Sequence, residues 1–177
     1  MGDKMKRVFL GVPLNKEYGD ACEQVKSMNH DVQGIRWVPE QNLHVTTLFI
    51  GNVEQKQIDT WCDDIEIILK QHRPFELAFD RFVFMPPRRP RMIWLKFKRS
   101  SDFARLTLAL SHKLLDQDPD SPPKAHVTLA RFKEAPEQKL IFPEMNLETI
   151  PVNKIQLYQS VLTPQGATYS VLKSFDL

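Results

Sequence analysis

The chain has 177 residues, of which 42% are hydrophobic and 26% are charged, so it carries enough apolar side chain to bury a core. Its 24 basic and 22 acidic residues leave a formal charge of +2, which excludes a polybasic protein that holds nucleic acid through net charge alone. The length predicts one domain, residues 1–177, built as a single unit or as two similar lobes.

Two cysteines and the N-terminal residues bear on the compartment. Cys22 and Cys62 fall in segments with helical periodicity, and the chain contains no C-x-x-C. Reduced, buried thiols in a cytosolic protein are therefore favoured over a disulfide. The first residues contain no long apolar stretch, so neither a signal peptide nor a membrane span is expected. These features predict a cytoplasmic protein.

The first half of the chain alternates strand and helix patterns. Residues 7–12 are a short apolar run that predicts a strand. A helix is predicted next by apolar residues at helical spacing: Leu14, Tyr18, Cys22, Val25 and Met28. Residues 30–42 read as a loop, and residues 43–50 predict a second strand that Gly51 closes. Asn52 with Gln55 predicts a helix cap. The helix after it has the cleanest apolar stripe in the chain: Ile58, Trp61, Cys62, Ile65, Ile68 and Leu69.

The second half contains two predicted hairpins around a third helix. Alternating aromatic residues change phase at Asp80–Arg81, which predicts a bulge or bend there. Residues 85–90 form a Pro-rich turn, and residues 92–97 complete a hairpin. A helix capped by Ser101 is followed by a polar loop at 116–124, a strand at 125–132 and irregular residues 133–151. The final hairpin comprises 155–162 and 168–172, around Pro164-Gln165-Gly166. This order predicts an α+β fold with mainly antiparallel pairing.

A short motif occurs twice, once in each half of the chain. His44-Val45-Thr46 and His126-Val127-Thr128 each lie in an apolar run with strand character, 82 residues apart. Because side chains alternate along a strand, the histidine and threonine of each copy point to the same face. One copy carries little information, but two copies in matching settings predict a single site with a histidine from each strand.

Paired histidines suit acid–base chemistry at a phosphorus atom. Histidine titrates near neutral pH, so one imidazole can take a proton from water while the other gives one to the leaving alkoxide. The hydroxyls of Thr46 and Thr128 are placed to hold the non-bridging oxygens. This chemistry needs no metal and no cofactor.

Three other interpretations compete with this one. Neither His44 nor His126 has a second metal ligand at useful spacing, and no H-E-x-x-H is present, so a metal site is disfavoured. No G-x-S-x-G occurs and neither cysteine lies near a motif, which disfavours a covalent nucleophile. Two ordinary core histidines are the remaining alternative.

At these residues the chain resembles the two-histidine phosphoesterase superfamily, and specifically its LigT-like branch of RNA 2′,3′-cyclic phosphodiesterases, historically called 2′-5′ RNA ligases. The similarity runs nearly from end to end. The matching segments are RVFLGVPL at 7–14, RWVPEQNLHVT at 36–46, FIG at 49–51, PRMIWL at 90–95, HVTLAR at 126–131, LYQS at 157–160 and GATY at 166–169. Thr47 stands where a leucine is commoner, and it should point away from the site.

The resemblance implies two lobes related by a pseudo-twofold axis, each with an antiparallel sheet backed by outer helices, and a central cleft that holds both histidines. It implies a monomer that hydrolyses 2′,3′-cyclic phosphate ends of RNA or nucleotides to 2′-phosphates without metal, cofactor or membrane. His44 matches the proton donor and His126 the proton acceptor. Thr46 and Thr128 match the threonines that hold the phosphate. The reverse reaction would join ends through a 2′-5′ linkage.

Several residues remain open between substrate contact and a structural role. Arg131 is a candidate phosphate contact, but strict alternation places it on the face opposite His126, so it reaches the site only if the strand bends or ends. Trp37 is a candidate for stacking a base, whereas Phe9 fits the core better. Near the proline turn, Arg88 and Arg89 read as solvated, and Arg91 is a further candidate contact.

Two other functions stay open at this point. The protein could bind RNA ends without turning them over, although both motifs are intact. The same chemistry could also act on another cyclic phosphate or on a 2′-5′ oligonucleotide, because the motif reads phosphate and ribose geometry and not the rest of the substrate.

Overall fold

The strands form a long antiparallel sheet that is nearly divided in two. The computed structural model describes residues 5–119, 121–164 and 166–177. Its strands are β1 (Lys6–Pro13), β2 (Arg36–Trp37), β3 (His44–Val53), β4 (Phe75–Leu77), β5 (Phe79–Met85), β6 (Met92–Phe97), β7 (His126–Arg131), β8 (Ile150–Val152), β9 (Lys154–Thr163) and β10 (Gly166–Asp176). Its helices are α1 (Lys16–Met28), the 3₁₀ turn η1 (Glu40–Asn42), α2 (Gln55–Leu69) and α3 (Ser101–Leu115).

The main sheet runs in the order β10-β9-β1-β3-β7-β6-β5, with β2 added beside β7, and β4 pairs with β8 in a small second sheet. Between β3 and β7 a single register pair is formed, Val45 with Val127. All these pairs are antiparallel, which confirms the predicted α+β class. The two expected sheets are the two halves of this main sheet. One half comprises β10, β9, β1 and β3, the other comprises β7, β6 and β5 with β2, and they meet at the Val45–Val127 pair.

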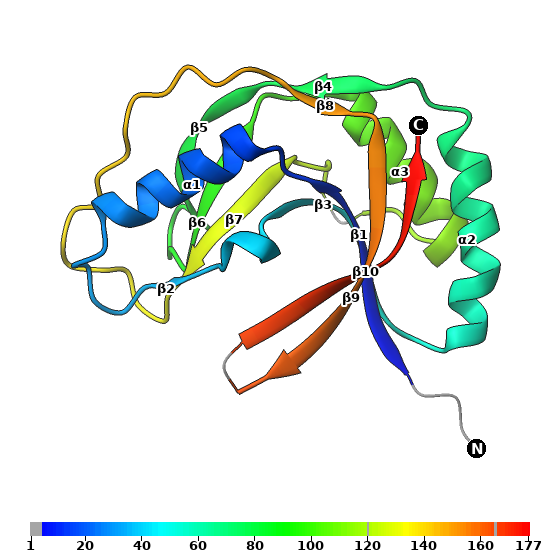
Figure 1. Cartoon of the computed structure of the whole chain (residues 1–177), viewed down its shortest axis with the longest axis horizontal. Coiled ribbons are helices and arrows are strands. Elements are labelled where there is room, and N and C mark those ends of the chain that lie inside the picture. Colours follow the sequence, from blue (N-terminus) through cyan, green and yellow to red (C-terminus); the bar gives the residue numbers. More distant parts are fainter. Residues whose placement is uncertain (1–4, 120, 165) are drawn as a thin grey trace.

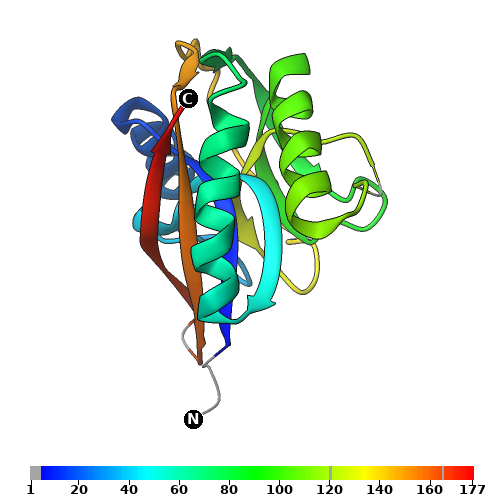
Figure 2. The ribbon, with the colours of Figure 1, turned by 90° about the vertical axis from the view of Figure 1, so that its right-hand side faces the viewer.

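The helices cover the sheet from outside and connect its halves. Helices α2 and α3 lie side by side against it (Figure 2), and α2 also contacts β10. Helix α3 follows β6 in the chain but packs against β3 in the other half. In the opposite direction, the Tyr18 ring of α1 stacks on Phe97 of β6, with ring centroids 5.5 Å apart. The two halves therefore share a core.

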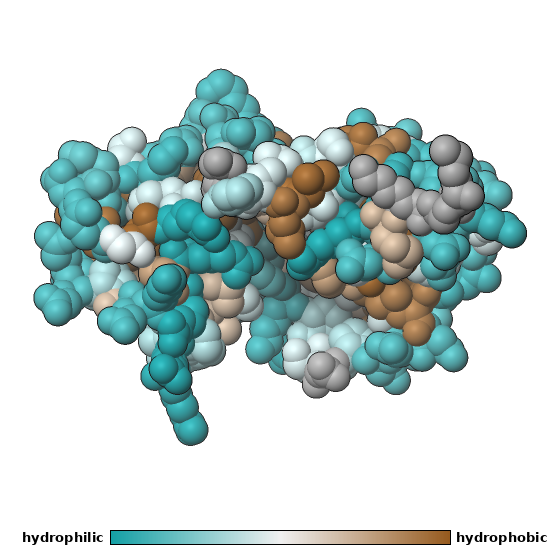
Figure 3. All heavy atoms as spheres, turned by 90° about the horizontal axis from the view of Figure 1, so that it is seen from below, coloured by the Kyte–Doolittle hydropathy of each residue, from teal (hydrophilic) through white to brown (hydrophobic). Residues whose placement is uncertain are grey.

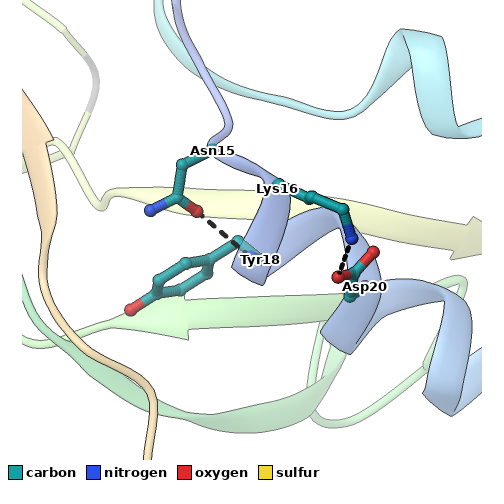
Figure 4. Close-up of polar contacts among 4 residues, drawn as sticks. All are labelled: Asn15, Lys16, Tyr18 and Asp20. Carbon is teal, nitrogen blue, oxygen red and sulfur yellow. Dashed lines mark hydrogen bonds and ion pairs between the residues drawn. The ribbon is translucent and has the colours of Figure 1, made fainter.

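Local chemistry sets the start of α1. The side-chain oxygen of Asn15 accepts a hydrogen bond from the backbone N–H of Tyr18 at 3.1 Å (Figure 4), which satisfies one of the free N–H groups of the first turn. Lys16 and Asp20 form an exposed ion pair one turn apart in the same view. The buried phenol of Tyr18 donates to the Glu148 carbonyl, so the helix is also tied to the 133–151 segment.

Three local predictions were wrong. Asn52 does not cap α2: it pairs with Arg7 inside β3, and the N-cap is Glu54, whose side chain makes no capping bond. Gly51 does not close β3, which continues to Val53. Ser100, not Ser101, caps α3 by accepting from the Phe103 N–H.

Segments predicted as loops also contain short strands. Residues 30–42 include β2 and η1, and residues 133–151 include the start of β8. The final hairpin is longer than predicted, with both strands extended (Figure 1), and Gln165 of its turn lies outside the described residues. The predicted bulge at Asp80–Arg81 is confirmed by a register shift between Phe79 and Arg81. None of the helices in the described ranges is both long and apolar enough to cross a bilayer.

Candidate active site

The four motif side chains gather on one face of the joint between β3 and β7. Since Val45 faces Val127 in an antiparallel pair, His44 lies across from Thr128 and Thr46 across from His126. Both valines are fully buried, whereas the four motif side chains are half-buried. An antiparallel pair has local twofold symmetry, so the two motifs are related by an axis through the valine pair. The histidines sit on a diagonal of this quartet, which corresponds to about 7–8 Å between backbone positions.

A cavity of about 670 Å³ opens over the quartet. All four motif side chains line it, together with the hairpin of β9 and β10. Three arginines, Arg7, Arg36 and Arg131, also line it, and no acidic residue is among its lining residues in the described ranges. Figure 3 shows this lower face hollowed between the two halves of the molecule, with hydrophilic and hydrophobic side chains around the hollow. The balance of charge makes the cavity a site for an anion.

The ring of His44 is oriented by contacts on both nitrogens. Its Nδ1 lies 2.7 Å from the carbonyl oxygen of Asn42, and because a carbonyl only accepts, Nδ1 carries the proton. Its Nε2 lies 3.0 Å from the Thr46 hydroxyl and faces the cavity. The ring also packs on Phe9, with centroids 4.6 Å apart.

The surroundings of His126 are similar. Its Nδ1 lies 2.8 Å from the carbonyl oxygen of Lys124, so Nδ1 again carries the proton and Nε2 is left for chemistry. The Trp94 ring stacks on the imidazole at 3.6 Å between centroids and 17° between planes. Each histidine thus has a backbone carbonyl two residues earlier that fixes its tautomer and an aromatic ring that fixes its tilt.

The environment lowers the pKa of both histidines. Burial is the main cause for His44, and the nearby His126 also lowers its pKa, while the bond to the Asn42 carbonyl acts in the opposite direction. Burial is again the main cause for His126; the Lys124 carbonyl opposes it, and the charge of Arg131 lowers this pKa further. Without an anion, both rings are therefore biased toward the neutral form. The guanidinium of Arg131 acts on His126 and not on His44, which makes the two rings electrostatically different.

Arg131 lines the cavity on the same face of β7 as His126, whereas strict alternation along the strand predicts the opposite face. The register between β6 and β7 shifts between Ile93 and Trp94, so β7 has one extra residue at Leu129. Leu129 and Ala130 are consequently both buried, and the following side chain returns to the face of His126. One guanidinium nitrogen of Arg131 donates to the sulfur of Met92 at 3.0 Å.

The first motif has the same bulge at the equivalent position. The register between β1 and β3 shifts between Leu10 and Gly11, which leaves Thr47 as the extra residue. Thr47 and Leu48 are both buried, and Phe49 returns to the cavity side. Thr47 thus lies away from the cavity, as predicted. Phe49 and Arg131 are each five residues after a motif histidine, a shared offset that is visible in the sequence but was not used to select Phe49.

Other residues selected from the sequence lie elsewhere. Phe9 lines the cavity but is only 3% exposed, in agreement with a core role. Trp37 packs against the core and does not line the cavity, although its neighbour Arg36 does. Arg91 does not line it either. Sequence analysis missed Arg7 and Arg36 as site residues, because each lies in a segment that was assessed only for its strand or loop character.

The two cysteines and the possible metal ligands bear on the alternative chemistries considered from the sequence. Both cysteines are free thiols; Cys22 is buried as predicted, whereas Cys62 is only half-buried. Burial raises the pKa of the Cys22 thiol to about 12, so it is not a thiolate at neutral pH. In the described residues no group of three or more His, Cys, Asp or Glu side chains is placed to hold a metal ion.

Comparisons with known proteins agree on one family. The sequence model of the 2′-5′ RNA ligase superfamily matches residues 19–160. The RNA 2′,3′-cyclic phosphodiesterase of Archaeoglobus fulgidus is 29% identical over 177 residues, covering 96% of this chain and 99% of that protein. The crystal structure of TT0787 from Thermus thermophilus superposes with a TM-score of 0.84 at 29% identity and 97% coverage of both chains. Apo LigT from E. coli has the same fold, with a TM-score of 0.81 at 19% identity and 99% coverage of both.

Proposed function

Because the chain belongs to the 2′-5′ RNA ligase superfamily, we propose that it hydrolyses 2′,3′-cyclic phosphate ends of RNA or nucleotides to 2′-phosphates. One observation carries this proposal. Two histidines and two threonines project from paired strands into a cavity whose charged lining is wholly cationic in the described ranges. A cyclic phosphodiester is an anion that needs both a proton acceptor and a proton donor, and the cavity offers both.

In the proposed reaction, water attacks phosphorus from the side opposite the 3′ oxygen. The Nε2 of His126 takes a proton from the water as the new P–O bond forms. The bond from phosphorus to O3′ breaks, and the Nε2 proton of His44 passes to O3′. The product has a 2′-phosphate and a 3′-hydroxyl, and the two rings exchange protons with solvent before the next turnover. The diagonal placement of the histidines supports this in-line geometry.

The charge of Arg131 supports the role of His126 as the base, because it lowers the pKa of that ring further below the value set by burial and so favours its neutral form. The pKa of His44 is also lowered, by burial and by the charge of His126, so the acid role of His44 requires the bound phosphate, which would raise that pKa and supply the protonated ring. Thr46, Thr128 and Arg131 hold the non-bridging oxygens while charge builds on them. No step uses a metal ion or a cofactor.

We also propose that residues 1–177 act as one bilobal, monomeric domain. The quartet needs β3 from one half and β7 from the other, and α1 and α3 each pack across to the opposite half. Neither half alone carries the site. The reverse reaction, joining ends through a 2′-5′ linkage, follows from microscopic reversibility and is minor in dilute solution. We place the reaction in the cytoplasm, with RNA or nucleotide ends as partners.

The test is hydrolysis of a nucleoside 2′,3′-cyclic phosphate in the presence of EDTA, with phosphorus NMR to identify the product. Formation of the 2′-phosphate alone is the expected result. A 3′-phosphate product would exchange the roles of the two histidines. Tight binding of a cyclic-ended RNA without turnover would contradict the proposal and favour a module that only binds RNA ends.

A further inference from the structure

The stack between Trp94 and His126 is the closest aromatic contact that either motif histidine makes. The two ring centroids are 3.6 Å apart, and the planes are inclined by 17°. The corresponding values for Phe9 on His44 are 4.6 Å and 31°. Because stacked carbon atoms do not approach much closer than about 3.5 Å, a separation of 3.6 Å leaves almost no lateral offset. The imidazole of His126 is therefore centred over the face of the indole.

A centred stack suits a charged imidazole better than a neutral one. Two neutral aromatic rings prefer an offset or edge-to-face arrangement, because the negative faces of their π systems repel each other. An imidazolium is instead attracted to the face of an indole, which binds cations more strongly than the other aromatic side chains do. The geometry of this pair thus fits the protonated ring that His126 becomes after it accepts a proton.

Strand register holds the indole beside the imidazole and outside the cavity. Trp94 of β6 faces Thr128 of β7, so its side chain lies on the same face of the sheet as His126. Trp94 is not among the residues that line the cavity. Its indole N–H is buried and has no hydrogen-bond partner in the described residues, an arrangement that lowers stability and shows that the ring is held by packing alone. Trp94 is thus placed to act on His126 and not on the substrate.

The charged groups on the neighbouring strands do not favour a positive charge on His126. Arg131, on the same strand, is a cation, and His44 of β3 becomes one when it is protonated. Lys96 of β6 faces His126 in the register, and its ammonium is paired with Asp80 of β5 at 3.0 Å. That pair leaves the one nearby carboxylate of the sheet engaged with another cation.

The segment before β7 offers no free carboxylate either. Asp118 and Lys124 line a second hollow that also touches His126, and Asp118 lies 2.9 Å from Nε2 of His112. Throughout the described ranges, no carboxylate forms an ion pair or a hydrogen bond with His126. Apart from one backbone carbonyl, the π face of Trp94 is the group that favours a positive charge on this ring.

We propose that Trp94 is a positioning residue for the reaction, whose indole face stabilises the imidazolium that His126 becomes when it takes a proton from the attacking water. This inference rests on the proposed function and gives a role in it to a side chain that does not line the cavity. Arg131 opposes a positive charge on His126 in the free protein, but a bound phosphate would neutralise that guanidinium. The indole carries no charge to neutralise, so its effect persists in the complex, where the proton is transferred.

The first experiment measures the pKa of His126 by NMR of its imidazole nitrogens, together with the pH–rate profile. Trp94→Leu removes the π face and keeps an apolar side chain. It is expected to lower the pKa of His126 by about half a unit or more, to move the acid limb of kcat/KM to lower pH by the same amount, and to lower kcat by about threefold or more. Trp94→Phe keeps a π face and should stay closer to the parent protein on all three measurements.

The sign of the shift separates this role from simple packing. If Trp94 only covers the imidazole, Trp94→Leu exposes His126 to water, and its pKa rises because burial is the main cause that lowers it. Trp61→Leu is the matched control, since it removes a half-buried indole that packs against the core from α2. This variant should change neither the pKa of His126 nor kcat.

Fluorinated tryptophans introduced at position 94 test the same point with almost no change of shape. Each added fluorine withdraws negative charge from the face of the indole, so the pKa of His126 and log kcat should fall stepwise with the number of fluorine atoms. The absence of a trend in both would overturn the inference, even if Trp94→Leu did not fold.

The NMR titration needs no turnover, so the inference and the proposed function can fail separately. Normal hydrolysis, with a pKa of His126 that is unchanged or raised in Trp94→Leu, would retain the activity and overturn the inference. A pKa that falls in Trp94→Leu, in a protein that hydrolyses no cyclic phosphate, would retain the contact between indole and imidazolium and reject the activity, and with it the part of Trp94 in catalysis.

Discussion

Val45 and Val127 face each other at the joint of the two half-sheets, and this one pair sets the geometry of the whole site. Each valine is fully buried and is flanked on both sides by motif residues that point to the opposite face. Any shift of β3 against β7 would move one histidine past the other. The distance between the two histidines therefore depends on two buried apolar side chains on the other face of the sheet.

Shortening either valine should separate stability from catalysis. Val45→Ala or Val127→Ala is expected to lower the free energy of unfolding by about 2 kcal/mol, from lost burial and a small cavity. Val8→Ala, at a fully buried position of β1 away from the joint, should cost about the same. Only the joint variants should also lower kcat, because only they loosen the quartet. Equal kcat in all three variants, measured well below their unfolding temperatures, would show that the joint does not control the site.

Arg131 should control the acid limb of the pH–rate profile. Burial is the main reason that the pKa of His126 is low, and the charge of Arg131 lowers it further. Arg131→Gln removes that charge, so the pKa of His126 rises and the acid limb of kcat/KM moves to higher pH. Arg131→Lys keeps a positive charge and should shift the limb less. A limb that stays in place or moves to lower pH in Arg131→Gln would contradict the assignment of His126 as the base.

The arginine lining should make RNA binding sensitive to salt. Arg36 and Arg131 face each other across β2 and β7, and both line the cavity, an arrangement of like charges that an anion would relieve. Arg36→Gln is expected to raise KM for a cyclic-ended RNA and to lower the slope of log KM against log salt by about one. Arg88→Gln removes an equal charge from an exposed turn that does not line the cavity. If the slope falls equally in both variants, the salt dependence comes from the net charge of the protein and not from a contact between Arg36 and the RNA.

The two histidines should also make the fold less stable in mild acid. Their pKa values in the folded protein are below 6.5, so between those values and 6.5 the unfolded chain binds more protons than the folded one. Stability therefore rises with pH in this window, and it is lost as pH falls below 6.5 toward the folded-state pKa values. Chemical denaturation should show a weaker pH dependence in the His44→Gln/His126→Gln double variant than in the parent protein. An unaltered pH dependence in the double variant would mean that other groups cause it.

Sequence periodicity predicted the faces of the motif residues because alternation holds over the two steps from histidine to threonine. It failed for Arg131 because the bulge at Leu129 reverses the alternation, and a bulge depends on how β7 pairs with β6. The sequence of one strand does not show in which register the neighbouring strand pairs with it. Phe49 was not selected for the same reason: next to Leu48 and Ile50 it resembles one more core residue, and only the register shift at Thr47 turns it toward the cavity.

Longer elements were predictable, and their ends were not. The apolar stripe of α2 runs from Ile58 to Leu69, which is more than three turns, so the helix itself was predictable. Its predicted cap was wrong because Asn52 is held in β3 by pairing with Arg7. Ser100 and Ser101 both satisfy a capping pattern, and the backbone geometry decides between them. Strand β2 has two residues, too few for any periodicity, and forms only because β7 lies beside it.

The acid and base roles can be tested most directly with a substrate whose leaving group needs no proton. A nucleoside 2′,3′-cyclic phosphate with sulfur in place of O3′ releases a thiolate, which leaves without general acid assistance. On the oxygen substrate, His44→Ala and His126→Ala should each lose about 10²–10⁴-fold in kcat. On the sulfur substrate, His44→Ala should recover most of the parent rate, and His126→Ala should not. Recovery of His126→Ala with no recovery of His44→Ala would contradict the assignment and exchange the two roles.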